Sequence, residues 1–77
     1  ERILSFWMKD TLIPLDILFL NAQGVVVDVH TMHTQIGVPD GALKLYRSAG
    51  LARFALEVNA GVGETLGIVR GAPVLFR

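Results

Sequence analysis

Short apolar runs separated by turn-forming residues set the pattern of the chain. Residues 3–8, 15–20 and 25–29 are rich in aliphatic, aromatic and β-branched side chains, which favour strands over helices. The segment 21–24 reads Asn-Ala-Gln-Gly, and its final glycine suits a positive φ. This pattern predicts three strands, with a β-hairpin over residues 14–32.

The second half of the chain alternates between loop and strand signals. Residues 33–50 contain several Gly and Pro residues without a clear period, which predicts a loop. Apolar and polar residues alternate over 52–58, as expected of a fourth strand. Residues 68–69 and 73–76 predict two further short strands around a Gly-Ala turn.

A short helix is expected near residues 60–67. Asn59 is a candidate N-cap, Glu64 suits the positive N-terminal turn, and Gly67 suits the left-handed C-terminal position. The whole order predicts an all-β fold, a mainly antiparallel β-sandwich or small barrel with one short helix. We expect residues 1–77 to form one domain.

The chain is apolar for its length. Hydrophobic residues make up 52% of its 77 residues, and so short a chain buries only about 60% of its unfolded surface. Either the core is unusually dense, or part of the surface is covered by another chain. We favour the second explanation, a homo-oligomer or a strand exchange between copies, because a small sheet leaves edges and faces that it cannot cover.

Charge and cysteine content exclude several classes of function. Seven basic and seven acidic residues cancel, whereas a nucleic-acid-binding protein usually has a net basic footprint. The absence of cysteine excludes disulfides, Fe–S ligation and thiol catalysis. The longest apolar run, Leu12 to Leu20, is interrupted by Pro14 and Asp16, so the sequence predicts no membrane span.

A polar triplet beside the only tryptophan is the best candidate for a ligand site. The predicted ligand-binding residues are Trp7, Lys9, Asp10, Thr11 and Asp16. Asp16 lies within an apolar run, and a buried carboxylate needs hydrogen-bond partners. In one interpretation it is a structural clamp that accepts backbone N–H groups and locks the turn before Pro14. In the other, the five residues form a pocket for a small polar ligand.

Two histidines are a further candidate for chemistry. His30 and His33 are three residues apart, which places them on opposite faces of a strand. Asp28 shares a face with His30, but no further ligands complete a metal site. We therefore expect no metal and no cofactor, and we interpret this segment as a solvated strand end.

The first third of the chain resembles a known family. The stretch "SFWMKDTLIPLDILFLNAQGVVVDV" is similar to the signature of the domain of unknown function 192 family, with Asp10 where Asn is commoner. The tail "ARFALEVNAGVGETLGIVRGAPVLF" resembles the closing part of that family, with Ala72 in place of the usual Asp. The residues that match are Phe6, Trp7, Met8, Lys9, Thr11, Pro14, Leu15, Asp16, Phe19, Leu56, Glu57, Gly61, Gly67 and Gly71.

The resemblance implies a β-sandwich with one short helix, and no established reaction. Family domains usually begin with a further N-terminal segment, so the resemblance implies that this chain is the C-terminal two-thirds of such a domain. Many members look exported or envelope-associated and others cytosolic, which leaves the compartment open.

Three hypotheses about function follow. The leading one is a non-enzymatic binding or assembly module. An alternative is an enzyme acting on a saccharide or another cell-envelope compound, with Asp10 or Asp16 as acid or base, which needs two carboxylates at one cleft. The third is a structural half-domain that dimerises.

Overall fold

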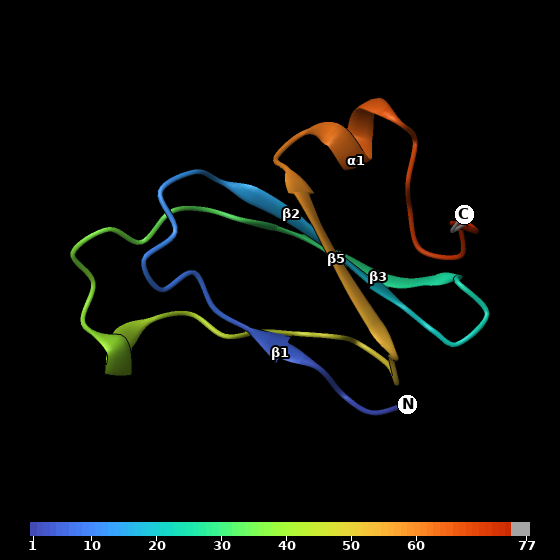
Figure 1. Cartoon of the computed structure of the whole chain (residues 1–77), viewed down its shortest axis with the longest axis horizontal. Coiled ribbons are helices and arrows are strands. Elements are labelled where there is room, and N and C mark those ends of the chain that lie inside the picture. Colours follow the sequence, from blue (N-terminus) through green and yellow to red (C-terminus); the bar gives the residue numbers. More distant parts are fainter. Residues whose placement is uncertain (75–77) are drawn as a thin grey trace.

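The computed structural model describes residues 1–74, which form three layers (Figure 1). A three-stranded antiparallel sheet of order β3-β2-β5 lies in the middle, a two-stranded β1-β4 ribbon covers one side, and the chain after α1 covers the other, with α1 at the end of β5. The elements are β1 (Ser5–Phe6), β2 (Leu15–Leu20), β3 (Val26–Met32), a 3-10 turn (Asp40–Ala42), β4 (Tyr46–Arg47), β5 (Phe54–Asn59) and α1 (Val62–Thr65). The predicted mainly antiparallel β fold with one short helix is confirmed.

The predicted hairpin over residues 14–32 is confirmed. β2 and β3 pair antiparallel, with Leu15 opposite Met32. The Asn21 side-chain oxygen accepts hydrogen bonds of 3.0 Å from the N–H groups of Gln23 and Val25, which closes the turn. Gly24 has a φ of 77°, a conformation that glycine adopts without a steric penalty.

The central strand β2 is buried on both faces. Ile17 and Phe19 pack toward the β1-β4 ribbon, while Leu18 and Leu20 pack toward the chain that follows α1. All four side chains are 0% exposed. A β strand points successive side chains to opposite faces, so a continuous apolar run is what a strand between two covering layers requires.

The first predicted strand is shorter than expected. Residues 3–8 were predicted to be extended throughout, but only Ser5 and Phe6 pair with β4. Arg2 adds an isolated bridge to Ala52. The ribbon is short because β4 itself has only two residues, between the long loop and the turn that leads to β5.

The prediction of a strand at residues 68–69 is wrong, because these residues form no strand. The N–H of Ile68 donates to the Gly63 carbonyl at 2.8 Å, and the Val69 carbonyl accepts from Ala72 at 2.9 Å. These local bonds occupy the groups that a strand ladder would use. Of the strand predicted at 73–76, Pro73 makes an isolated bridge to Val25, and residues 75–76 lie outside the described residues.

The long loop over residues 33–50 is confirmed apart from two short elements. The 3-10 turn begins after Pro39, and its backbone bonds run from Ala42 N–H to Pro39 and from Leu43 N–H to Asp40. β4 follows, and its Tyr46 side chain returns the loop to the core. The loop therefore reaches away from the sheet and comes back beside β1.

Candidate functional site

The polar triplet after Trp7 forms a tight turn anchored on the core. Met8 is 2% exposed, and its carbonyl accepts the N–H of Thr11 at 3.2 Å. The Thr11 hydroxyl donates to the Lys9 carbonyl at 3.2 Å. Asp10 sits at the corner with a φ of 57°, and it is the one non-glycine residue with positive φ among residues 1–74. That conformation is unfavourable for a residue with a Cβ, so the surrounding turn must hold it.

The 35–43 loop faces this turn and encloses a small hollow with it, which we call the loop pocket. Its volume is about 130 Å³. Gln35 holds its own side of the loop by accepting the Lys44 N–H at 3.1 Å through its side-chain oxygen. The pocket is lined by Met8, Lys9, Asp10, Thr11, Leu12, Gln35, Ile36, Gly37, Val38, Asp40 and Leu43.

An ion pair joins the two sides of the loop pocket. The Lys9 ammonium lies 2.8 Å from the Asp40 carboxylate and 5.6 Å from the Trp7 ring. The hydrogen bond and charge of Asp40 raise the pKa of Lys9, and the nearby Asp10 carboxylate raises it further. Lys9 is therefore a fully charged donor at neutral pH. Within residues 1–74 the Asp10 carboxylate makes no hydrogen bond or ion pair.

Apolar side chains form the rim of the loop pocket. Leu12 is 74% exposed and Ile36 is 72% exposed, and they come from the two opposing segments. Trp7 lies outside the pocket, 45% exposed, beside Leu45 in a shallower hollow. The pocket therefore has polar side chains in its wall and apolar side chains at its rim. This combination suits a ligand that carries both polar and apolar surface.

Asp16 is separated from the other four predicted site residues. Its carboxylate is 3% exposed and accepts hydrogen bonds from the Gly61 N–H at 2.9 Å, the Gly63 N–H at 3.3 Å and the Thr31 hydroxyl at 2.8 Å. The structure thus brings Lys9, Asp10 and Thr11 together at the loop pocket, with Trp7 beside it. Asp10 and Asp16 line different hollows, so they do not face each other across one cleft.

Asp16 takes the place of a helix cap. Asn59 was predicted to cap the helix, but the N-cap is Gly61, with a φ of 92° and no side-chain cap of its own. The Asp16 carboxylate reaches across from β2 and satisfies the first N–H groups of α1, where negative charge is favourable. The expected backbone clamp is present, although it holds the helix rather than the turn before Pro14. At the other end Gly67 has a φ of 68°, as predicted.

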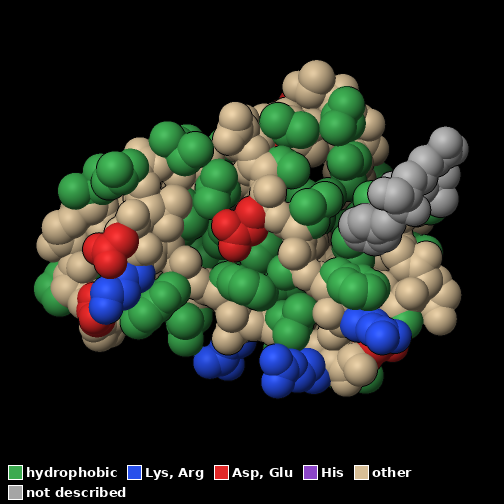
Figure 2. All heavy atoms as spheres, viewed as in Figure 1, with side chains coloured by type: hydrophobic (Ala, Val, Ile, Leu, Met, Phe, Trp, Pro, Cys, Tyr) green, Lys and Arg blue, Asp and Glu red, His purple; other side chains and the backbone are tan. Residues whose placement is uncertain are grey.

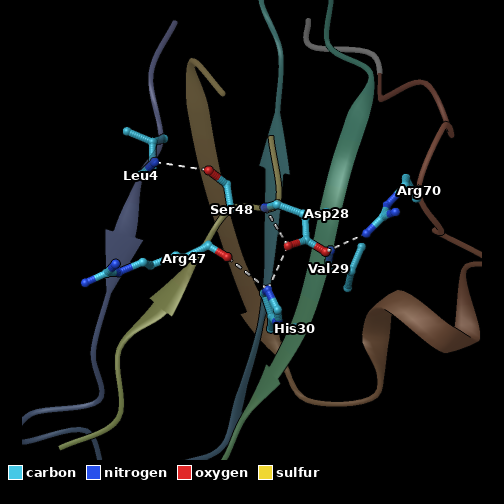
Figure 3. A network of polar contacts seen from close by, with 8 residues as sticks. Leu4, Asp28, Val29, His30, Arg47, Ser48 and Arg70 are labelled. Carbon is cyan, nitrogen blue, oxygen red and sulfur yellow. Dashed lines mark hydrogen bonds and ion pairs between the residues drawn. The ribbon is translucent and has the colours of Figure 1, made fainter. Parts of the chain in front are cut away.

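A second polar cluster centres on Asp28, which we had interpreted as part of a solvated strand end. That interpretation is wrong, because Asp28 is only 7% exposed. Its carboxylate accepts the Ala49 N–H at 2.9 Å and lies 2.8 Å from His30 Nε2 and 3.5 Å from the Arg70 guanidinium (Figure 3). Burial pushes the pKa of Asp28 upward, but the Ala49 N–H and His30 outweigh it and leave that pKa below its ordinary value.

The Asp28 cluster holds three separate segments together. His30 Nε2 also lies 3.2 Å from the Arg47 carbonyl, and since both of its neighbours are acceptors this nitrogen carries the hydrogen. One residue further on, Ser48 Oγ accepts the Leu4 N–H at 3.1 Å. An aspartate within a run of valines was the signal for this cluster in the sequence.

A wide, open groove of about 760 Å³ runs between the β3 edge and α1, next to both buried aspartates. Glu64 and Arg70 stand at its sides. Among the described residues, no three His, Asp or Glu side chains are grouped so that they can hold a metal ion. In the same part of the chain, no helix has the length and apolar character needed to cross a membrane.

Comparison with known proteins identifies a family. No curated protein and no solved structure matches the chain. The model of the DUF192 family, described as "Uncharacterized ACR", matches residues 1–76. The family suggested by the Trp-containing motif is therefore confirmed, while the share of a longer domain that this chain represents stays a prediction. Since the match covers nearly every residue, the chain belongs to the DUF192 family.

Proposed function

We propose that this domain is a non-enzymatic binding module whose loop pocket takes a small polar ligand. The observation that carries the proposal is the position of Asp10. Its backbone, with a φ of 57°, holds an exposed carboxylate that makes no hydrogen bond or ion pair among residues 1–74 at the wall of a partly open hollow. Strained residues persist where the surrounding structure fixes them, and they concentrate at ligand sites.

The lining indicates the chemistry of the ligand. Asp10 supplies hydrogen-bond acceptors, and the Lys9 ammonium supplies donors beyond the one that Asp40 uses. Leu12 and Ile36 add apolar contact at the rim. A small molecule with hydroxyl or amine donors on a compact apolar body matches this lining. A polyanion would be repelled by the Asp10 and Asp40 carboxylates.

Binding is better supported than catalysis by the carboxylates. An acid/base pair needs two carboxyl groups at one cleft, and Asp16 is engaged by Thr31, Gly61 and Gly63 on the far side of the sheet from β1. The loop pocket instead combines apolar walls with a few polar groups, as is typical of small-molecule sites.

The test is a thermal-shift screen of small polyols and amines against three proteins. Asp10→Gly removes the carboxylate and fits the positive φ, so the fold is retained. Glu64→Gln removes a carboxylate at the other groove as a matched control. We expect the strongest stabilising compound to lose at least about tenfold in affinity with Asp10→Gly, as the loss of one charged hydrogen bond implies. Equal affinity for all three proteins would contradict the proposal.

A further inference from the structure

The charges that line the loop pocket do not balance. The lining carries one ammonium, that of Lys9, and two carboxylates, those of Asp10 and Asp40. No other side chain is charged among the residues of 1–74 that line the pocket, so its walls carry one spare negative charge. In the same view as Figure 1, Figure 2 shows acidic groups on both sides of a basic group at the end that carries the 3-10 turn, with hydrophobic side chains around them.

Three side chains of the loop pocket have oxygens that can accept hydrogen bonds from a ligand. The exposed Asp10 carboxylate makes no hydrogen bond or ion pair within residues 1–74. Lys9 contacts one oxygen of Asp40, Oδ2, at 2.8 Å, and a carboxylate offers about four lone-pair sites. The Thr11 hydroxyl directs its hydrogen to the Lys9 carbonyl and keeps its oxygen as an acceptor. A primary ammonium has three N–H donors, which these three side chains match in number.

The size of the loop pocket limits the ligand. Its volume of about 130 Å³ is the room of roughly four water molecules, each of which takes about 30 Å³ in the liquid. This space suits an ammonium group and the few carbons next to it. Leu12 and Ile36, both exposed at the rim, can then contact the rest of a compact apolar body.

Lys9 opposes a cationic ligand, although it can donate to a neutral one. Its ion pair with Asp40 and the nearby Asp10 carboxylate raise its pKa, so its ammonium is positive at neutral pH. That charge repels a second cation in the pocket, whereas Asp10 and Asp40 attract it. The two carboxylates outweigh the single ammonium. The ion pair of 2.8 Å instead ties the 35–43 loop to the turn that carries Asp10.

We propose that the ligand of the loop pocket is a small primary amine, bound as its ammonium ion by Asp10, Asp40 and Thr11. This inference rests on the proposed function, and it adds the charge of the ligand and the residues that select that charge. Charge-assisted hydrogen bonds are roughly twice as strong as neutral ones. An amine therefore binds more tightly than an alcohol of the same skeleton, and a carboxylate, which meets the spare negative charge, binds most weakly.

Three head groups on one ring test the charge of the ligand. Cyclopentylamine, cyclopentanol and cyclopentanecarboxylate are titrated into the whole chain at pH 7, and amide NMR shifts give the affinities. At this pH the amine is ionised, since aliphatic amines have pKa values near the lysine value of about 10.4. We expect the amine to shift residues 8–12 and 35–43 and to bind at least about tenfold more tightly than the alcohol.

The same titrations separate this inference from the proposed function. If the alcohol binds at residues 8–12 and 35–43 as tightly as the amine, the inference is overturned and the proposed function stands. If none of the three compounds shifts these residues, the inference fails, and the wider screen of polyols and amines decides the proposed function separately.

A lysine side chain of another protein offers the same ammonium, so Nα-acetyl-lysine methylamide is titrated as a fourth compound. We expect it to bind more weakly than cyclopentylamine, because its flexible side chain loses rotamer freedom on binding. Tighter binding of the lysine compound overturns the assignment to a free amine.

Charge variants test the selecting residues through the ratio of amine to alcohol affinity. This ratio cancels any general loss of the pocket, because the alcohol shares it. Asp10→Asn keeps a residue that tolerates a positive φ, and we expect the ratio to fall at least about fivefold with the loss of the charge. Lys9→Gln should raise the ratio at least about twofold, since it removes the opposing cation.

Lys44→Gln is the matched control for Lys9→Gln. Lys44 is exposed and does not line the loop pocket, so the same substitution there changes the net charge of the chain alone. We expect its ratio to equal that of the wild type. A ratio that Asp10→Asn leaves unchanged, or that Lys9→Gln lowers relative to Lys44→Gln, overturns the inference, because the carboxylates would then not select the ligand by its charge.

Discussion

The Asp16 carboxylate accepts a hydrogen bond of 2.9 Å from the N–H of Gly61, a residue 45 positions further along the chain. This contact ties the central strand to the first turn of α1. It also explains why a helix of only four residues, Val62–Thr65, forms where isolated short helices are unstable. Asp16 is a structural residue, and the ligand site that we propose lies at the other polar turn.

Replacing Asp16 should separate its hydrogen bonds from its charge. Asp16→Ala leaves the Gly61 and Gly63 N–H groups without an acceptor, and we expect the free energy of unfolding to fall by about 2–4 kcal/mol. Asp16→Asn keeps one oxygen toward both N–H groups and turns its NH₂ toward the Thr31 hydroxyl, so the loss should be below about 1 kcal/mol. Urea unfolding of the three proteins measures both values.

The Asp28 cluster should make stability depend on acid pH. The pKa of Asp28 in the folded chain lies below its ordinary value of 3.8, chiefly through Ala49 and His30 acting against burial. A lowered pKa stabilises the folded chain at pH values above the ordinary pKa. This stability is lost as the pH falls through the pKa of the folded state. Asp28→Asn should therefore be less stable than the wild type at neutral pH, with the difference shrinking below about pH 4. Urea midpoints that fall in parallel for both proteins would argue against this coupling.

Backbone strain at Asp10 predicts an unusual order of stability. Asp10→Gly should stay within about 1 kcal/mol of the wild type, because glycine adopts a positive φ freely. A β-branched residue is strongly disfavoured there, so Asp10→Val should lower the free energy of unfolding by about 1–2 kcal/mol. Equal stability of the glycine and valine variants would show that the turn does not hold a positive φ at this position.

Burial of β2 on both faces predicts two equally sensitive neighbours. Ile17→Ala removes packing against the β1-β4 ribbon, and Leu18→Ala removes packing in the cluster that includes Ile68, Ala72 and Val74 after α1. Each should lower the free energy of unfolding by about 2–5 kcal/mol, the usual range for a buried aliphatic side chain. Denaturation of the exposed variant Leu12→Ala supplies the control, with a loss below about 0.5 kcal/mol. Unchanged stability of Leu18→Ala would mean that the layer formed by residues 68–74 contributes little.

Local signals were sufficient to predict the central elements from the sequence. The β-branched run before Val29 and the turn ending in Gly24 depend on residues close in the chain, and the structure bears both out. Predictions failed where contacts outside the local segment determine the backbone conformation. Ile68 is strand-like by composition, but its N–H caps α1 at the Gly63 carbonyl instead.

Long-range partners also explain what the sequence revealed of the site. Lys9, Asp10 and Thr11 are consecutive, so their shared turn could be predicted from the sequence. The position of the 35–43 loop opposite this turn could not. The backbone N–H partners of the two aspartates, Gly61 for Asp16 and Ala49 for Asp28, come from segments after residue 48, and no local pattern announces them. Sequence could therefore indicate that a buried aspartate needs partners, but not which ones.

The most direct test of the central claim is amide NMR of the wild-type chain with a compact diol and a compact diamine. The account predicts concentration-dependent shifts at residues 8–12 and 35–43, with residues 61–70 around the other groove unchanged. Shifts centred on residues 61–70, or none at either place for both compounds, would contradict a binding site at the loop pocket.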